Sequence, residues 1–418
     1  MHSRTAKILV LGALMLALPL VAMAQTSRVE GMSIQGDYIK DYTGIFTYTS
    51  GVSNVGNLVY GELGVATGGT PVDRAVGAVM GDWWEGRLGT WAIHMRQFTP
   101  QLGQGDATSN PAPGSPPLAS DPNFNTSEQF DIMWGKKFGT TALGLRLNRS
   151  FGQVELDNDP VGLGNVSDLK FDFTQFDPNL ARNVLGVGVG LGFEMSPTTN
   201  IETNIMWQSR SFEIADTNGV TTAESDGKTT YQLAVRAWWQ WQPNVMVVPV
   251  FKWYSYDLST TAGATSADNS LKGWQVGAAG NWTIGSNDLF VLGLTFAQNK
   301  IEQEADLFGA GFDSGTITET FTPQVFAALE THVNSWLSLR FGANKGAWHR
   351  TEFEDNDTPS DLIIHDSPFN MTLGAGVKVG SLQLDAVMND AFPHNGLNFI
   401  SGNTTSPLFP KVTATYAF

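Results

Sequence analysis

Hydrophobic residues recur at every second position along several stretches of the chain. The clearest stretch is 185–193, where leucine, valine and phenylalanine alternate with four glycines. Stretches 143–148, 337–344 and 371–379 have the same period, with glycine or polar residues between the hydrophobic ones. Successive side chains of a strand point to opposite faces of a sheet, so this period predicts strands with one hydrophobic face.

The period predicts about sixteen antiparallel strands. The first two, 57–66 and 75–84, alternate least clearly, and without them the count is fourteen. An even number returns both chain ends to one side, as in bacterial up-and-down barrels. The predicted strands are 57–66, 75–84, 88–98, 127–138, 141–155, 183–195, 199–214, 229–241, 245–258, 270–283, 287–302, 317–333, 336–350, 367–379, 382–390 and 408–418.

Short turns alternate with long polar segments between these strands. Long segments include 303–316, 352–366 and the proline-rich 100–125. Transmembrane β-barrels have short turns at the periplasmic end and long loops outside. The pattern therefore predicts an all-β fold, a transmembrane antiparallel up-and-down β-barrel. Short turns are predicted at 85–87, 139–140, 196–198, 242–244, 285–287, 334–335 and 380–381.

The two ends of the chain carry sequences typical of export and of barrel assembly. A short basic region, a hydrophobic run and the sequence Ala-Met-Ala predict a signal peptide over 1–24, cleaved after Ala24. The last strand ends on Tyr416 and Phe418. A secreted chain with such an end resembles Gram-negative outer-membrane β-barrels of the porin-like superfamily. The resemblance implies that the barrel-assembly machinery reads Tyr416 and Phe418, and that the protein lies in the bacterial outer membrane.

The composition agrees with a sheet that faces lipid. Charged residues make up 15% of the chain, whereas about 25% is typical of soluble domains. The chain has 45 glycines and no cysteine, and a closed barrel needs no disulfide to satisfy its backbone. After residue 24 the apolar runs are much shorter than the ~20 residues of a transmembrane helix, so only strands are expected to cross a membrane.

The formal net charge is −16, which argues against nucleic acid as a partner because no basic stripe is present. Acidic residues concentrate in the long segments. They fit contact with outer-membrane lipid and lipopolysaccharide through divalent cations, and they equally fit a solvated surface.

Residues 25–56 precede the first predicted strand and lack alternation. They separate the signal peptide (1–24) from the barrel (57–418). This segment is either a periplasmic tail or a plug in the lumen, as in the hatch-bearing long-chain fatty-acid transporter family. The glycine faces of 185–193 and 371–379 leave parts of the wall without side chains, which either holds a plug or eases the curvature of the sheet.

The second face of the predicted strands is polar and carries both signs of charge. An arginine or lysine facing lipid at mid-depth costs ~2–4 kcal/mol, so these side chains are expected to face the lumen. They either set the solute preference of an aqueous channel or pair with one another as packing. The predicted lumen-lining residues are His94, Arg96, Asp131, Lys137, Arg146, Glu202, Arg210, Arg236, Lys252, Glu330, Arg340 and Asp385.

Motifs for catalysis are not evident. The six histidines show no metal-ligand spacing, and no Gly-x-Ser-x-Gly sequence occurs. We therefore expect no enzyme activity, no cofactor and no metal site. The expected function is porin-like passage of small solutes across the outer membrane. The alternatives are a plugged transporter of hydrophobic molecules and a non-conducting surface protein.

Overall fold

The computed structural model describes most of the predicted strands and the segment before them. It describes residues 26–65, 71–81, 86–96, 129–153, 180–215, 221–225, 229–262, 265–285, 287–304, 314–356, 362–388 and 408–418. The predicted signal peptide and segment 100–125 lie outside the described residues.

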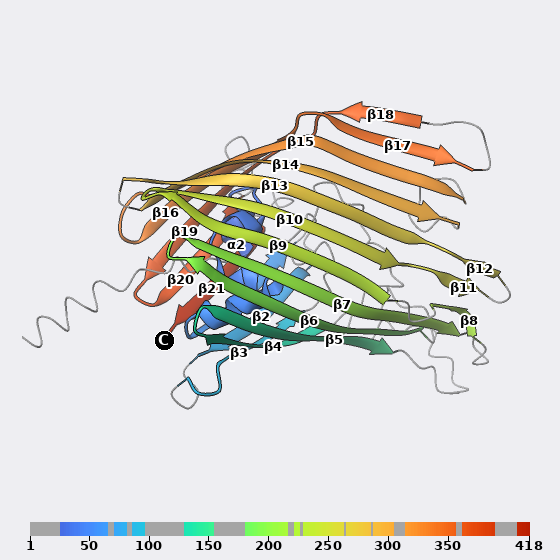
Figure 1. Cartoon of the computed structure of the whole chain (residues 1–418), viewed down its shortest axis with the longest axis horizontal. Helices are drawn as coiled ribbons and strands as arrows, with labels where there is room; N and C mark the ends of the chain where they lie inside the picture. The colour runs from blue at the N-terminus through green and yellow to red at the C-terminus, as the bar shows by residue number, and fades with distance from the viewer. Residues whose placement is uncertain are drawn as a thin grey trace, which may run out of the picture.

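Sixteen antiparallel strands close into a barrel, which confirms the predicted fold class and the larger strand count (Figure 1). β1 pairs with β21 from Leu58↔Ala417 to Gly64↔Lys411, and this pairing closes the sheet. Closure removes the sheet edges whose backbone groups lipid cannot satisfy. The wall consists of β1 (Leu58–Val65), β2 (Pro71–Met80), β3 (Thr90–Arg96), β4 (Gln129–Phe138), β5 (Thr141–Gln153), β6 (Leu180–Ser196), β7 (Thr199–Ala215), β9 (Thr229–Gln242), β10 (Val245–Asp257), β13 (Ser270–Ile284), β14 (Asp288–Gln303), β15 (Gly315–His332), β16 (Leu337–Gly346), β19 (Phe369–Val379), β20 (Leu382–Met388) and β21 (Lys411–Ala417).

Short strands extend the wall at the long-loop end. β8 (Thr221–Glu224) pairs with β7 and with β11 (Thr260–Ala262), which pairs in turn with β12 (Thr265–Ala267). β17 (His349–Asp355) and β18 (Leu362–Asp366) form a hairpin along the first half of β15. The predicted strand 336–350 is thus divided between β16 and β17.

Glycines make the tight turns at the opposite end possible. Gly139, Gly285 and Gly380 have φ angles of 61°, 60° and 61°. Residues with a Cβ rarely adopt this conformation, so glycine is favoured where two strands meet in a short turn.

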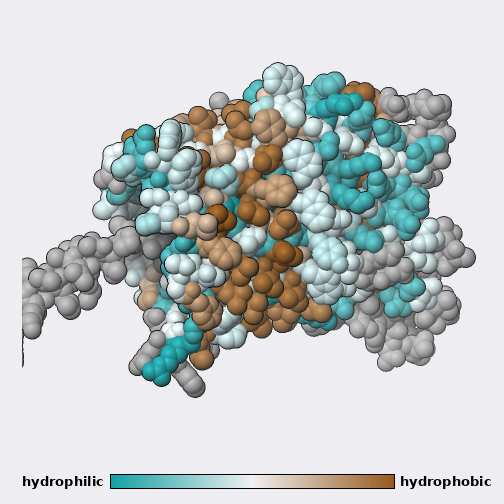
Figure 2. Space-filling model, in the orientation of Figure 1, coloured by the Kyte–Doolittle hydropathy of each residue, from teal (hydrophilic) through white to brown (hydrophobic). Residues whose placement is uncertain are grey.

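Hydrophobic side chains on the outer face form a belt around the barrel. On β3 the exposed residues Trp91, Ile93 and Met95 alternate with buried ones. Figure 2 shows the belt as a band across the middle of the visible face, with hydrophilic residues towards the long-loop end. Because an exposed hydrophobic belt is unfavourable in water, it indicates that the barrel spans a lipid bilayer.

Short helices before β1 lie inside the barrel. None of the described helices has the length and apolar character needed to cross a bilayer. The helices, together called the N-terminal segment below, are α2 (Thr26–Glu30), η1 (Gly36–Tyr38), η2 (Tyr42–Phe46) and η3 (Thr49–Asn54). α2 contacts β19–β21, η1 contacts β10, and η3 contacts β3–β7. The segment therefore reaches from one wall of the barrel to the opposite wall (Figure 1).

Candidate functional site in the barrel interior

The predicted lumen-lining residues are almost all withdrawn from solvent. Arg146 exposes 11% of its side chain, and Lys137 exposes 44% at the short-turn end, where it pairs with Glu194. The remaining ten are buried: His94, Arg96, Asp131, Glu202, Arg210, Arg236, Lys252, Glu330, Arg340 and Asp385. Most of them contact the N-terminal segment or a charged neighbour on the wall.

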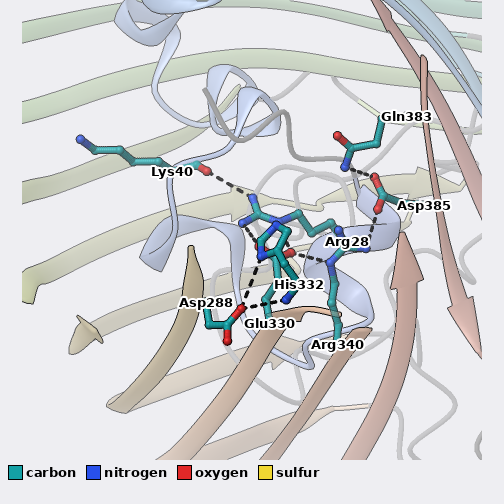
Figure 3. Close-up of polar contacts among 8 residues, drawn as sticks. All are labelled: Arg28, Lys40, Asp288, Glu330, His332, Arg340, Gln383 and Asp385. Carbon is teal, nitrogen blue, oxygen red and sulfur yellow. Dashed lines mark hydrogen bonds and ion pairs between the residues drawn. The ribbon is translucent and has the colours of Figure 1, made fainter. Parts of the chain in front are cut away.

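A network of four charged groups holds the start of the segment. Arg28 donates two hydrogen bonds of 2.7 Å to the two carboxylate oxygens of Glu330. Arg340 donates to Glu330 at 2.6 Å and also to Asp385. Figure 3 shows Arg28 and Arg340 converging on Glu330, with Asp385 beyond Arg340. Two cations and two anions balance, so the network can be buried without an uncompensated charge.

A second cluster fixes α2 to the strands that close the barrel. Lys411 of β21 lies 2.7 Å from Glu30 and 2.9 Å from Glu62 of β1. The hydroxyls of Ser27 and Thr413 are 2.6 Å apart. The same contacts thus link the segment to the β1–β21 seam.

The middle of the segment is held by β10, β13 and β14. Asp37 forms an ion pair with Lys252, whose side chain is fully buried. The Tyr38 hydroxyl lies 3.0 Å from that of Thr295, and Asn281 donates to the Tyr38 carbonyl at 2.7 Å. Because Asp37 places a carboxylate beside this buried ammonium, the ion pair links the segment to β10.

Arg236 connects the segment to the adjoining strands. It donates to Glu202 at 2.6 Å, and Glu202 also accepts from the Trp238 indole at 2.7 Å. The guanidinium lies 3.9 Å from the centre of the Tyr48 ring, a cation–π contact. Burial raises the pKa of the Tyr48 hydroxyl well above its usual range, so this ring stays neutral.

The end of the segment lies against β3–β7. Arg146 donates to Asp131 at 2.8 Å and to the Phe46 carbonyl at 2.5 Å. Thr49 donates its hydroxyl to Asn204 at 3.0 Å. His94 lies 4.6 Å from the Phe46 ring, and its Nδ1 is 2.7 Å from the Tyr60 hydroxyl. These wall residues therefore contact the segment directly.

Inward glycines give the segment room at both walls. A Cβ on Gly144 would lie 2.2 Å from Thr49, and one on Gly190 would lie 2.6 Å from the Ser50 nitrogen. A Cβ on Gly374 would lie 3.0 Å from Gly31. Of the two interpretations of the glycine faces, contact with the segment is the one that these distances support.

A group of buried hydrophobic residues lies on the wall beyond the segment, towards the long loops. Asn204 of β7 contacts the segment, and Arg210 lies six residues further along, roughly 20 Å at ~3.3 Å per residue. The tyrosines of this group, Tyr254 and Tyr256, meet edge to face at 5.5 Å. The loop-side cluster comprises Met206, Phe212, Tyr254, Tyr256, Leu258, Leu271 and Ile301.

Sequence patterns missed several partners of the predicted residues. Glu62 and Lys411 are buried residues of β1 and β21. Their positions in the alternation of these strands could have identified them as inward-facing. Arg28 and Asp37 lie in a segment without periodicity, and no sequence signal identifies their partners. Across the described ranges, no group of three metal-ligating side chains is present.

Comparisons with known proteins identify similar architectures. No protein-family profile and no curated protein matches the chain. A solved Pseudomonas aeruginosa FadL homologue has a TM-score of 0.44 and 11% identity, with 95% of this chain and 99% of that chain covered. The CymD monoaromatic hydrocarbon channel has a TM-score of 0.38 and 9% identity, with 96% and 99% covered.

The copper transporter OprC has a TM-score of 0.44 and 12% identity, over 79% of this chain and 53% of that chain. The chain thus spans about half the length of that transporter. None of these likenesses identifies a solute for this chain.

Proposed function

We propose that this protein is an outer-membrane transporter whose barrel is closed by the N-terminal segment and which admits small hydrophobic solutes from the long-loop side. One observation carries the proposal: the segment runs from β19–β21 to β3–β7, and buried ion pairs fix it to β15 and β10 between these walls. An always-open porin has no use for such a segment. The loop-side cluster supports a hydrophobic solute because it offers aromatic and aliphatic side chains inside the barrel.

The proposal includes export by residues 1–24, with cleavage after Ala24. It includes recognition of Tyr416 and Phe418 by the barrel-assembly machinery, and contact of the outer belt with lipid and lipopolysaccharide. Among the predicted lumen-lining residues, Glu330, Arg236, Lys252 and Arg146 then hold the segment, and the set as a whole lines the path that opens when it moves. Small solutes are the proposed cargo, and no catalytic step is proposed.

Conductance in planar bilayers tests the closure. The full chain is expected to give rare openings, and a variant lacking residues 26–54 is expected to give stable steps. Large, stable steps from the full chain would instead support the open porin. Silence from both proteins, each verified as folded by heat-modifiable migration, would support the non-conducting surface protein.

A disulfide tether tests whether the segment must move. The natural chain has no cysteine, so Ser27→Cys with Thr413→Cys introduces one defined pair at hydroxyls 2.6 Å apart. Uptake of a hydrophobic solute into proteoliposomes is expected to fall on oxidation and to recover on reduction. The single variant Ser27→Cys, treated in the same way, is the control. Uptake that ignores the oxidised tether would contradict movement at α2.

A further inference from the structure

Arg210 is a buried cation that, unlike five others in the barrel interior, has no carboxylate partner among the described residues. Arg28, Arg236, Arg340, Lys252 and Lys411 each pair with a carboxylate. Arg210 exposes 3% of its surface, and among the described residues no carboxylate lies within ion-pair distance of it. Its Nε donates to the amide oxygen of Gln208 at 2.7 Å, whereas its Nη2 is buried without an acceptor.

Tyr256 has a second unsatisfied donor beside this arginine. Its side chain is 1% exposed, and its hydroxyl is buried without a hydrogen-bond partner. The Arg210 Cζ lies 6.0 Å from the centre of the Tyr256 ring. Buried polar groups are normally hydrogen-bonded, and buried charges are normally paired, so two unsatisfied donors together indicate an acceptor that arrives from outside the chain.

The surroundings define what this acceptor must be. It must carry a negative charge, because it completes a buried guanidinium, and two oxygen atoms suit the two donors Nη2 and OH. The rest of the ligand meets the loop-side cluster, in which the rings of Phe212, Tyr254 and Tyr256 adjoin aliphatic side chains. Flat rings pack well against such aromatic side chains.

We infer that Arg210 and Tyr256 form a binding site for an aromatic monocarboxylate, held by its carboxylate at these two donors and by its ring in the loop-side cluster. The inference rests on the proposed transport function, because it names the solute class that the barrel takes up. The site lies beyond the N-terminal segment on the long-loop side, so the ligand binds before the segment moves.

Equilibrium dialysis of benzoate against the folded, detergent-purified full chain tests the site. Benzoate is water-soluble and ionised at neutral pH, so micelles retain little of it. Arg210→Gln is expected to weaken binding by about tenfold or more, and Tyr256→Phe by about threefold, because charge-assisted hydrogen bonds are lost. Arg350→Gln removes an exposed arginine elsewhere and is expected to leave the affinity unchanged.

Three further ligands define the class. Benzyl alcohol keeps the ring without the charge, and inorganic phosphate keeps charge without the ring. Hexanoate has the carboxylate on an aliphatic chain. Each is expected to bind about tenfold more weakly than benzoate. Phosphate binding as tight as that of benzoate would overturn the aromatic class in favour of a plain anion site. Equal binding of hexanoate would overturn the preference for a ring.

Two results would overturn the site. One is an unchanged benzoate affinity in both Arg210→Gln and Tyr256→Phe, and the other is no saturable binding of benzoate by the natural chain. Heat-modifiable migration verifies that each variant is folded, and Tyr256→Phe keeps the test decisive if Arg210→Gln does not fold.

Binding of benzoate needs no passage through the barrel, so the binding test and the tether test can fail separately. Benzoate binding that depends on Arg210, together with uptake indifferent to the tether, would leave the site standing and overturn the transport mechanism. Benzoate binding that does not depend on Arg210 or Tyr256, together with uptake that the oxidised tether blocks, would overturn the site and leave the transport mechanism standing.

Discussion

Gly342 of β16 lies directly against the backbone of Met32 in the N-terminal segment. A Cβ added to Gly342 would lie 1.6 Å from the Met32 carbonyl oxygen and 2.1 Å from its carbonyl carbon. Both neighbours are backbone atoms, so no side-chain rotation can relieve the contact. The wall and the segment therefore fit each other only where this wall position lacks a side chain.

Gly342→Ala is accordingly expected to displace the segment while the barrel stays folded. Protease cleavage within residues 26–54 and the frequency of conductance openings should both increase. Gly61→Ala is the matched control, since a Cβ there meets nothing within 4 Å. Equal behaviour of the two variants would show that the contact at Gly342 does not hold the segment.

Glu330 should matter more than Arg28 to the stability of the interior. Glu330→Gln leaves Arg28 and Arg340 without their shared carboxylate, whereas Arg28→Gln leaves Glu330 paired with Arg340. Breaking a buried pair from one side costs about 3–5 kcal/mol, so Glu330→Gln is expected to lower the free energy of unfolding by that amount. Denaturant titration in micelles measures both variants. A larger loss in Arg28→Gln would contradict the arrangement.

The pair Asp37 and Lys252 is expected to show strong coupling. Asp37→Asn removes the carboxylate that forms an ion pair with the fully buried Lys252 ammonium. The loss of about 3–5 kcal/mol should shrink when Lys252→Met is added, because the double variant no longer buries the ammonium that Asp37 stabilised. Denaturation midpoints of the two single variants and the double variant form the cycle. Additive losses would indicate that the two side chains do not interact.

The outer belt can be tested with two hydrophobic residues at different depths. Leu294 lies mid-strand on β14 and is 42% exposed, whereas Ile284 ends β13 beside a short turn and is 50% exposed. Leu294→Arg is expected to cost ~2–4 kcal/mol in lipid vesicles, and Ile284→Arg ~0–1 kcal/mol. Equal costs would mean that the belt is not centred on the bilayer as the alternation indicates.

The C-terminal aromatic residues should act in assembly more than in final stability. Tyr416 and Phe418 face outwards and stack at 6.5 Å, and the Phe418 amide donates to the Asn57 carbonyl at 3.2 Å. Phe418→Ala is expected to reduce the folded, heat-modifiable protein in outer membranes several-fold. Phe409→Ala, an exposed aromatic before the same strand, is the control. Equal yields of both variants would remove the assembly role of Phe418.

The amino-acid sequence by itself determined the wall of the barrel. A period of two is a local property of strand geometry, so stretches such as 185–193 and 371–379 were identified before any contact was known. The less regular strands 57–66 and 75–84 were predicted too, although β2 begins four residues earlier than expected, at Pro71. The division of 336–350 into β16 and β17 was missed, because alternation does not report which partner a strand has.

The tertiary structure decided what the interior contains. Parity predicted that Glu330, Arg236 and Lys252 face inwards, but an inward charge can meet water or another charge, and the sequence cannot distinguish these. Their contacts come from Arg28, Asp37 and Tyr48, which are close only after the barrel closes. The segment has no single period because it consists of four short helices, and those with described wall contacts meet different strands. Parity predicts an inward Arg210, whereas its lack of a carboxylate partner among the described residues follows from three-dimensional packing alone.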